Sequence, residues 1–356
     1  MDYIYRFPVV RGIQAGSEYY IAMVPLKMLS KLFSTDEEEY IPPEYRAQRR
    51  LKESRIPVIS KYILDNRENY VFSALAASID GEFEFKNNKA NDDTGILEVS
   101  MDAHFLINDG QHRKAAIMTA LKEDMSLENE TISIVFYADK GLRRSQQIFA
   151  DLNKNAVRTS NSISELYDSR DEMAVITRNV IWNNDFLNAY TDKEKDILGK
   201  YSSSLFTLNT FYTANKTIVG RTIKKDTEKF LLNYWNNIVE HMVQWQELQH
   251  REITKVDLRE SYIATQSIVI QALGRIGNYY ISHQNEMKNG LRDLEKVNWS
   301  RSAKQWYMRA VGKNGRIITS KRAALLISNV IKKELGITLS VEEINAEKAL
   351  KKAIKD

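Results

Sequence analysis

The residues best suited to chemistry form one continuous run: Asp109, Gly110, Gln111, His112 and Arg113. The run follows an apolar stretch typical of a strand (AHFLI) and leads into a stretch typical of a helix (KAAIMTAL). A glycine at such a junction lets a ligand approach the backbone, and the free amides of a helix start favour phosphate. The run therefore predicts a phosphate or nucleotide site, in which Arg113 grips a pair of phosphate oxygens.

The polar side chains of this run have candidate roles in catalysis. Asp109 is placed to cap the helix or to orient a water or a metal-bound ligand, and His112 is placed to transfer a proton. The alternative is that Asp109 is only a helix cap and that the other side chains decorate an exposed helix start. Adjacent polar side chains on one turn lower helix propensity and bury nothing, which favours the site. The predicted catalytic residues are Asp109, His112 and Arg113.

The elements around this run predict a mixed α/β fold with a small sheet. Residues 70–134 contain several short strand-like runs, in which Asp80 and Gly81 predict a hairpin turn. Residues 87–95 read as a loop inserted in the sheet. Residues 44–66 are typical of helix on both sides of a proline, so helices are expected before the sheet.

After the sheet the pattern becomes almost wholly helical. Long helices are predicted at 227–250 and 258–283, and their apolar stripes are ordinary core. Capping boxes at Ser162 and Ser340 predict two further helix starts. The last two helices surround Gly336, an arrangement that fits either a DNA-reading helix-turn-helix or a common packing motif.

Length and composition set the domain organisation. A chain of 356 residues fits two domains, or one body with an appendage. We predict an α/β core at 1–160, a helical domain at 161–300 and a basic helical segment at 301–356. The absence of cysteine excludes disulfides, thiol catalysis and thiolate zinc sites, and no signal peptide or apolar span is recognisable, so we expect a cytoplasmic protein.

The net charge of +4 is unevenly distributed. Residues 301–356 contain 13 Lys or Arg against 5 Asp or Glu, which is typical of a surface for the phosphate backbone, although basic helices are also commonly solvated faces. The predicted DNA contacts are Lys154, Arg158, Lys313, Arg316, Lys321 and Arg322. Trp299 and Trp306 lie among basic residues, and packing is favoured over base stacking for them.

Other common sites are disfavoured. The chain has neither a Gly-rich Walker loop nor a G-x-S-x-G elbow, which argues against ordinary kinases and esterases. The histidines lack acidic residues at supporting spacing, so no metal site is expected beyond a magnesium ion that accompanies a nucleotide.

The pentapeptide at 109–113 resembles the defining motif of the DGQHR-domain family. Gln48 and Arg49 match the companion Q-R motif of that family, and residues 147–171 are similar to the helical segment that follows its sheet. The combination is similar to the DndB group of DNA sulfur modification proteins, over roughly residues 40–340.

This resemblance implies a core related to the ParB and sulfiredoxin fold, in which the loop-to-helix junction binds a nucleotide phosphate. The implied nucleotide site comprises Gly110, Gln111, Arg113, Gln48 and Arg49, with a nucleoside triphosphate and Mg²⁺ as the expected ligands. The implied function is DNA binding in a phosphorothioation system, chiefly as transcriptional regulator of the modification operon. The expected partners are double-stranded DNA, other proteins of the system and a second copy of the chain. No membrane partner is expected.

Two other functions remain open. Because other DGQHR proteins hydrolyse nucleoside triphosphates, the first is a triphosphatase coupled to DNA processing, such as nicking. The second is an interaction subunit of the modification complex.

Overall fold

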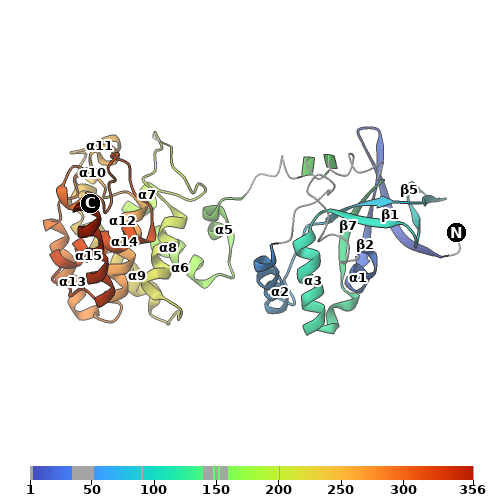
Figure 1. The fold of residues 1–356 in the computed structure, drawn as a ribbon, viewed down its shortest axis with the longest axis horizontal. Coiled ribbons are helices and arrows are strands. Elements are labelled where there is room, and N and C mark those ends of the chain that lie inside the picture. The colour runs from blue at the N-terminus through green and yellow to red at the C-terminus, as the bar shows by residue number, and fades with distance from the viewer. Residues whose placement is uncertain are drawn as a thin grey trace. The chain divides into compact units, whose positions relative to one another are not determined.

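The computed structural model describes residues 3–33, 52–89, 91–138, 147–148, 151–152, 159–199 and 201–355. The chain divides into two compact units, Met1–Val157 and Arg158–Asp356 (Figure 1). The first unit contains a seven-stranded mixed sheet and the second is mostly helical, so the predicted fold class is confirmed. The predicted boundary at 160 lies beside the division between the units.

The sheet of the first unit has the strand order β4-β5-β1-β2-β7-β3-β6. Only β3 and β7 pair in parallel, and every other described pair is antiparallel. Buried and exposed residues alternate along β2 and β7, because one face of the sheet packs against the core. The strands are β1 (Ile4–Gln14), β2 (Ser17–Pro25), β3 (Leu75–Asp80), β4 (Phe83–Asn88), β5 (Asn91–Ser100), β6 (His104–Asp109) and β7 (Thr131–Ala138).

Several sequence expectations for this sheet were wrong. Two strands, β1 and β2, precede the helices, and their connection uses the positive φ angles of Ala15 (47°) and Gly16 (71°). Asp80 does not close a hairpin, because β3 pairs with β6 and β7 while β4 pairs with β5. Residues 87–95 are no inserted loop, since residues 87–88 end β4 and residues 91–95 begin β5.

The helices of the first unit share the hydrophobic core of the sheet. α2 (Ile56–Asp65) begins with Pro57 in its first turn, as predicted, and packs against α3 (Gln111–Glu123). The core beneath them includes Leu75, Ile134 and Phe136, all fully buried. The remaining helical elements of this unit are α1 (Leu29–Leu32), η1 (Leu26–Met28), η3 (Glu53–Arg55) and η4 (Met125–Asn129).

The second unit is a helical body with a two-stranded ladder of β8 (Thr191–Asp192) and β9 (Phe206–Thr207). Its core is rich in aromatic side chains, and the rings of Trp299 and Trp306 stack 5.7 Å apart, so the packing role predicted for them is confirmed. The helices are α5 (Asn161–Tyr167), α6 (Glu172–Trp182), α7 (Asp185–Tyr190), α8 (Leu208–Val219), α9 (Thr227–His241), α10 (Val243–Gln249), α11 (Lys255–Ser261), α12 (Ser267–Tyr280), α13 (Gln284–Leu291), α14 (Lys321–Glu334) and α15 (Val341–Lys355), with η5 (Arg292–Lys296) and η6 (Lys304–Trp306).

Helix boundaries in this unit differ in part from the prediction. The two long predicted helices are each divided, into α9 and α10 and into α11 and α12. Ser162 does not cap α5, because Ser160 accepts the hydrogen bond from the Ile163 amide at 3.0 Å. The predicted capping box at Ser340 is confirmed by its reciprocal bonds with Glu343, of 2.9 and 3.3 Å. α14 packs against α12 in the same hydrophobic core.

No described helix is both long and apolar enough to cross a membrane.

Candidate functional site

The DGQHR turn, residues 109–113, joins β6 to α3 as the sequence predicts. β6 ends at Asp109 and α3 begins at Gln111, with Gly110 between them at a φ of 103°. A Cβ atom on Gly110 would lie 2.3 Å from Cδ2 of Leu75. Both the left-handed backbone and this close approach require glycine, so the turn depends on Gly110 for its shape.

The start of α3 is open to an anion. No side chain caps this helix, and its first turn contains no acidic residue. Asp109, which was considered as a cap, instead forms an ion pair with Arg113. The first amides of a helix lack intrahelical acceptors and lie at the positive end of the helix dipole. The backbone is therefore suited to a phosphate group, and phosphate binding at this turn stays a prediction.

Arg113 braces the turn. Its Nη1 donates to the carbonyl oxygens of Ser73 at 2.6 Å and Ala74 at 2.9 Å, and also to the Ser73 hydroxyl. Its Nη2 donates to Oδ2 of Asp109 at 2.5 Å, and only 17% of the side chain is exposed. A guanidinium has five N–H donors, and most of them are used here. A phosphate contact by Arg113 stays a prediction and would use the remaining donors.

His112 accepts a hydrogen bond at Nε2, so this ring nitrogen carries no proton that it could donate to a substrate. Its Nε2 accepts from the backbone amide of Lys52 at 2.9 Å, which requires Nε2 to be unprotonated. Burial, together with the charge of Arg55, lowers the pKa of His112 below its ordinary value. The imidazole is therefore neutral at physiological pH, and its structural role is to hold the chain at Lys52 beside the turn.

The remaining predicted nucleotide contacts are Gln48 and Arg49, which lie outside the described residues. They precede Lys52 by four and three residues, and Lys52 is bonded to His112. The described chain therefore returns to the DGQHR turn directly after this motif. Their contact with a nucleotide stays a prediction.

Sequence reasoning missed the groups that hold this turn. Ser73 and Ala74 bond Arg113 chiefly through carbonyl oxygens, which no residue type announces. Asn108 is fully buried, and its Oδ1 accepts from the Ser78 hydroxyl at 2.8 Å, which ties β6 to β3. An asparagine between an apolar strand and the pentapeptide was the one available signal.

The second candidate surface is the basic turn, which we define as Lys313, Arg316, Lys321 and Arg322. The peptide turn itself is closed by the Gly312 amide, which donates to the Arg316 carbonyl at 2.8 Å. All four basic side chains are exposed, and none forms an ion pair within the described part of the chain. The basic turn thus presents unneutralised positive charge to solvent.

Two of these basic residues lie at the start of α14, where positive charge is unfavourable. Ser320 caps α14 by accepting from the Ala323 amide at 3.2 Å, so Lys321 and Arg322 occupy its first turn. Cations at a helix N-terminus are opposed by the helix dipole and cost stability. Residues 323–331 are all buried, so the middle of α14 is closed to DNA, and its exposed residues lie in its first and last turns. The placement favours a functional role over helix stabilisation.

Three other basic residues of this region are engaged by groups of the chain itself. Lys332 pairs with Glu343 at 2.7 Å and Arg309 pairs with Glu347 at 2.8 Å, both on the buried side of α15. Arg301 donates from Nη2 to the carbonyl of Gly315 at 2.6 Å and so supports the turn. The surplus positive charge is therefore carried by the basic turn, by the exposed Lys304 and Lys333, and by the exposed lysines of α15, which are Lys348, Lys351 and Lys352.

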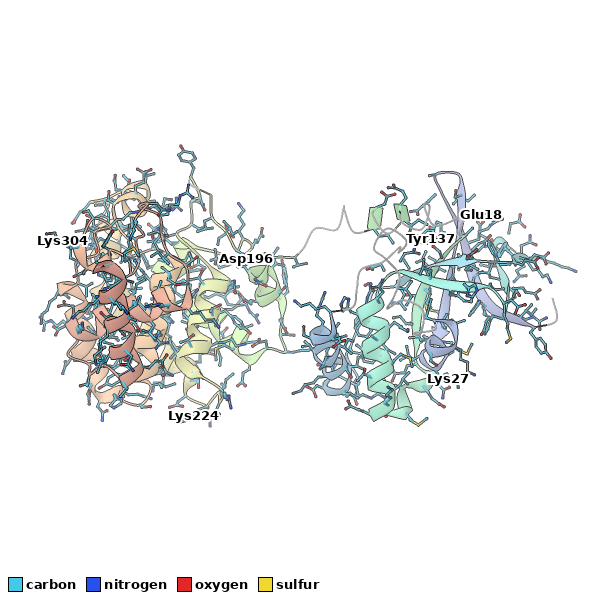
Figure 2. The ribbon with its side chains drawn as sticks, viewed as in Figure 1. Glu18, Lys27, Tyr137, Asp196, Lys224 and Lys304 are labelled. Atoms are coloured by element: carbon cyan, nitrogen blue, oxygen red, sulfur yellow. The ribbon has the colours of Figure 1, made fainter. Side chains whose placement is uncertain are left out.

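A second exposed basic set lies at the α8–α9 connection, and it is interleaved with acidic residues. It consists of Arg221, Lys224, Lys225 and Lys229, with Asp226 and Glu228 between them. Residues 311–323, by contrast, contain no acidic residue. In Figure 2, Lys224 lies away from Lys304, the residue that begins the short helix before the basic turn. This set is a matched control for the basic turn.

The other predicted DNA contacts, Lys154 and Arg158, lie outside the described residues. Within the residues that are described, no group of three or more His, Asp or Glu side chains could hold a metal ion.

The sequence model of one protein family, described as DndB: DNA-sulfur modification-associated, matches residues 7–338. The matched range covers nearly the whole chain and contains both the DGQHR turn and the basic turn. No curated protein and no solved structure gives a match.

Proposed function

This chain belongs to the DndB family of DNA-sulfur modification-associated proteins, and from that premise we propose that it binds double-stranded DNA as transcriptional regulator of the modification operon. The single observation that carries the proposal is the basic turn. Exposed Lys and Arg side chains without acidic partners are the usual contacts to DNA phosphates. The exposed lysines of α15 extend the same chemistry.

The geometry supports phosphate contacts more directly than base reading. α14 is buried from residue 323 to residue 331, so it cannot lie along a major groove. In α15, Glu343 and Glu347 face the core, whereas Lys348, Lys351 and Lys352 are exposed. If the pair acts as a helix-turn-helix, α15 is the helix that enters the groove, and the basic turn contacts the backbone beside it.

The regulator role is tested by fluorescence anisotropy at one fixed, near-physiological salt concentration. A labelled duplex from the upstream region of the protein's own operon is compared with a scrambled duplex of the same length and composition. We expect the operon duplex to bind about a thousandfold or more tightly, the lower range of specific recognition. Equal affinities would leave only binding to phosphate and would contradict regulation by this protein alone.

The second candidate function is nucleotide binding at the DGQHR turn. The uncapped start of α3 and the left-handed Gly110 support it, because both suit a close phosphate. The amides of Gly110 and Gln111 and the remaining donors of Arg113 would hold the phosphates, with Gln48 and Arg49 from the preceding segment. Asp109 is the nearby carboxylate for an accompanying Mg²⁺.

Binding is better supported than hydrolysis. His112 accepts its hydrogen bond as a neutral ring, and Arg113 is committed to Ser73, Ala74 and Asp109. Hydrolysis would require these groups to exchange protein partners for the reacting phosphate. The triphosphatase is therefore the alternative to nucleotide binding alone.

The two possibilities are separated by ATP turnover in the presence of magnesium. His112→Gln keeps an acceptor for the Lys52 amide but cannot transfer a proton, and Asp109→Asn keeps a hydrogen-bond acceptor for Arg113 without its charge. Turnover above buffer that falls about a hundredfold or more in His112→Gln would establish catalysis. No turnover in the wild type, with saturable ATP binding, would leave a binding site alone.

We further propose that the chain works with other proteins of the modification system and as a homo-oligomer. A symmetric dimer would present two basic turns to two DNA half-sites. Light scattering of the purified chain and co-purification with the other proteins of its operon test this. A monomer that binds none of them would contradict both partners.

A further inference from the structure

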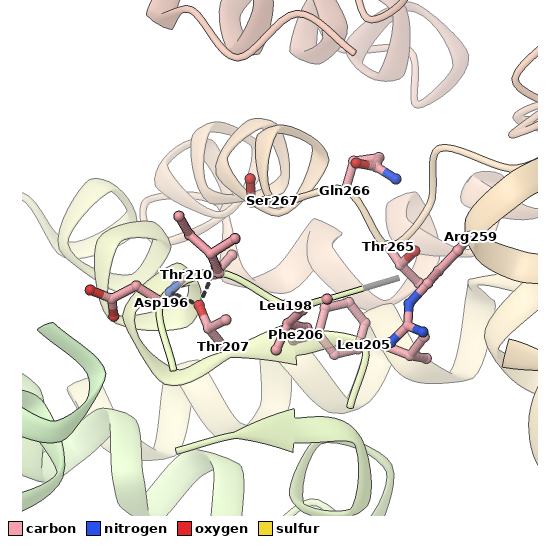
Figure 3. A pocket seen from close by; sticks show the side chains of 12 residues that line it. Asp196, Leu198, Leu205, Phe206, Thr207, Thr210, Arg259, Thr265, Gln266 and Ser267 are labelled. Atoms are coloured by element: carbon pink, nitrogen blue, oxygen red, sulfur yellow. Dashed lines mark hydrogen bonds between the residues drawn. The ribbon is translucent and has the colours of Figure 1, made fainter. Parts of the chain in front are cut away.

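A cavity of about 340 Å³ lies in the second unit, where the start of α12 meets β9 and α11 (Figure 3). We call it the α12 pocket. Its volume falls in the lower range of cavities that bind small molecules. Its polar lining includes Arg259, Thr265, Gln266 and Ser267. It lies within the unit that does not contain the DGQHR turn, so the two sites can be tested separately.

The start of α12 gives the pocket a positive end. α12 has 14 residues, no side chain caps it, and its first turn contains no acidic residue. Gln266, its N-cap residue, and Ser267, its first residue, both line the pocket. The neighbouring helix α8 differs, because Thr207 caps it by accepting from the Thr210 amide at 3.3 Å. The amides at the start of α12 are therefore the ones suited to an anion.

Arg259 adds a cation to the same cavity. Its guanidinium donates to the Ser204 carbonyl, and burial lowers its pKa from the ordinary value. An arginine nevertheless stays protonated in proteins, so the pocket wall carries a partly desolvated positive charge. An oxyanion in the cavity would replace part of the hydration that this side chain has lost.

Thr265 provides the independent sign of a ligand. Only 6% of this residue is exposed, and its hydroxyl forms no hydrogen bond with any described residue. This hydroxyl lines the cavity and is placed to bond a ligand oxygen there. In Figure 3, Thr265 and Arg259 lie next to each other at one end of the cavity.

Asp196, the acidic lining residue, does not cancel this charge. Its carboxylate accepts from the amides of Asn161 and Ser162, each at 2.8 Å, and from the Ser162 hydroxyl at 2.9 Å. Figure 3 shows that this carboxylate points away from Arg259. Asp196 is thus occupied with the start of α5 and does not pair with Arg259.

We propose that the α12 pocket binds a phosphate-type oxyanion, either free phosphate or the phosphate group of a small metabolite. A guanidinium, a hydroxyl and the amides of a helix start together match the oxygens of a tetrahedral anion. The site is separate from the proposed nucleotide site and does not depend on DNA binding.

Isothermal titration calorimetry of the full chain with inorganic phosphate, at constant ionic strength, tests this proposal. Thr265→Val removes the hydroxyl at nearly constant shape and breaks no hydrogen bond of the described structure, so it should leave folding intact. We expect it to weaken phosphate binding about tenfold, and Arg259→Gln to weaken it at least as much. Arg292→Gln removes an exposed charge of the same unit, and it should bind phosphate as the wild type does.

Two further arms identify the ligand and the site. Tighter binding of glycerol 3-phosphate than of phosphate, with no binding of glycerol, would indicate a phosphorylated metabolite, whereas equal binding would indicate free phosphate. The absence of saturable phosphate binding up to roughly 10 mM would overturn the proposal. Binding lost in Arg113→Lys but kept in Thr265→Val would also overturn it, because the anion would then occupy the DGQHR turn.

Discussion

The DGQHR turn and the basic turn both place arginine beside a helix start, yet they use its charge in opposite ways. In the DGQHR turn, Arg113 is mostly buried and bonded to Ser73, Ala74 and Asp109. In the basic turn, Arg316 and Arg322 are exposed and form no ion pair with a described residue. The conspicuous motif is therefore largely engaged within its own unit, and the inconspicuous segment has charge to offer a partner.

The difference shows that the DGQHR motif first specifies the backbone conformation of a strand-to-helix junction, and that its side chains are not all directed at a ligand. Gly110 and Arg113 build the strand-to-helix junction, and what the junction offers a ligand is mainly backbone amides. The basic turn gains nothing in stability from its charge, since Lys321 and Arg322 oppose the dipole of α14. This distinction between a structural arginine and a basic surface would be contradicted if Arg113 were dispensable for folding, or if the basic turn were necessary for folding.

The largest expected effect comes from removing the hydrogen bonds by which Arg113 holds the DGQHR turn. Arg113→Ala should lower the free energy of unfolding of the first unit by about 3 kcal/mol, because two carbonyls and a carboxylate lose a charged donor. All five tryptophans lie in residues 182–306, so tryptophan fluorescence reports the second unit alone. Hydrogen exchange of β6 and α3 should accelerate while the fluorescence transition stays unchanged. Unchanged hydrogen exchange would show that the bonds of Arg113 do not stabilise the first unit.

The next effect isolates the shape of the junction. Gly110→Ala should cost about 2 kcal/mol, because it combines a positive φ with a close approach to Leu75. Gly16→Ala is the matched control, since Gly16 has a φ of 71° but no atom within 4 Å of the added Cβ. Denaturation followed by circular dichroism compares the two variants. Equal losses would mean that the contact with Leu75 plays no part.

The free energies of unfolding of the two units should change with pH in opposite directions. The larger change is expected in the second unit. Burial, with the charges of Asp196 and Asp171, raises the pKa of Glu165 to about 8. The folded state then holds a proton that the unfolded state releases above about 4.5. Stability from this group is full below pH 4.5 and is lost as pH rises to about 8. Glu165→Gln should therefore raise the free energy of unfolding of the second unit at pH 8, followed by tryptophan fluorescence, by on the order of 1 to 2 kcal/mol, and so raise the midpoint of the transition.

A midpoint at pH 8 that is unchanged or lowered in Glu165→Gln would contradict this assignment. The same pair of proteins at pH 4 provides the control, because Glu165 is protonated in both states there and the substitution should have little effect.

The first unit should lose stability as pH falls. The pKa of His112 is lowered in the folded state, so the unfolded chain binds a proton more readily and stability decreases below about pH 6.5. Protonation also removes the acceptor for the Lys52 amide, a bond worth on the order of 1 kcal/mol. His112→Gln should flatten this part of the pH profile, as followed by hydrogen exchange of α3. A profile unchanged by the substitution would show that another group titrates.

The sequence predicted those parts of the structure that depend on local signals. The change of period before Gln111 located the junction of β6 and α3, and Ser340 with Glu343 located the start of α15. Each of these features depends on neighbours within a few positions.

Long-range pairing could not be predicted in the same way. Two partners of Arg113, Ser73 and Ala74, lie 40 and 39 positions away and accept through main-chain oxygens, which carry no sequence pattern. Asp80 and Gly81 have the composition of a hairpin, but β4 pairs with β5 instead, because the central strands β1 and β2 separate it from β3 in the sheet. The N-terminal strands themselves contain Pro8 and Gly12, which weaken a strand pattern.

The salt dependence of DNA binding tests the central claim most directly. Lys313, Arg316, Lys321 and Arg322 are replaced together by Gln, and the affinity for one duplex is measured by anisotropy across a range of salt concentrations. If all four contact phosphates, the log-log slope should become less steep by about 3 to 4, with stability unchanged within about 0.5 kcal/mol. Replacing Arg221, Lys224, Lys225 and Lys229 removes the same charge elsewhere and should leave the slope nearly unchanged. A wild-type slope in the basic-turn variant would contradict the account, because those side chains would then contact no DNA.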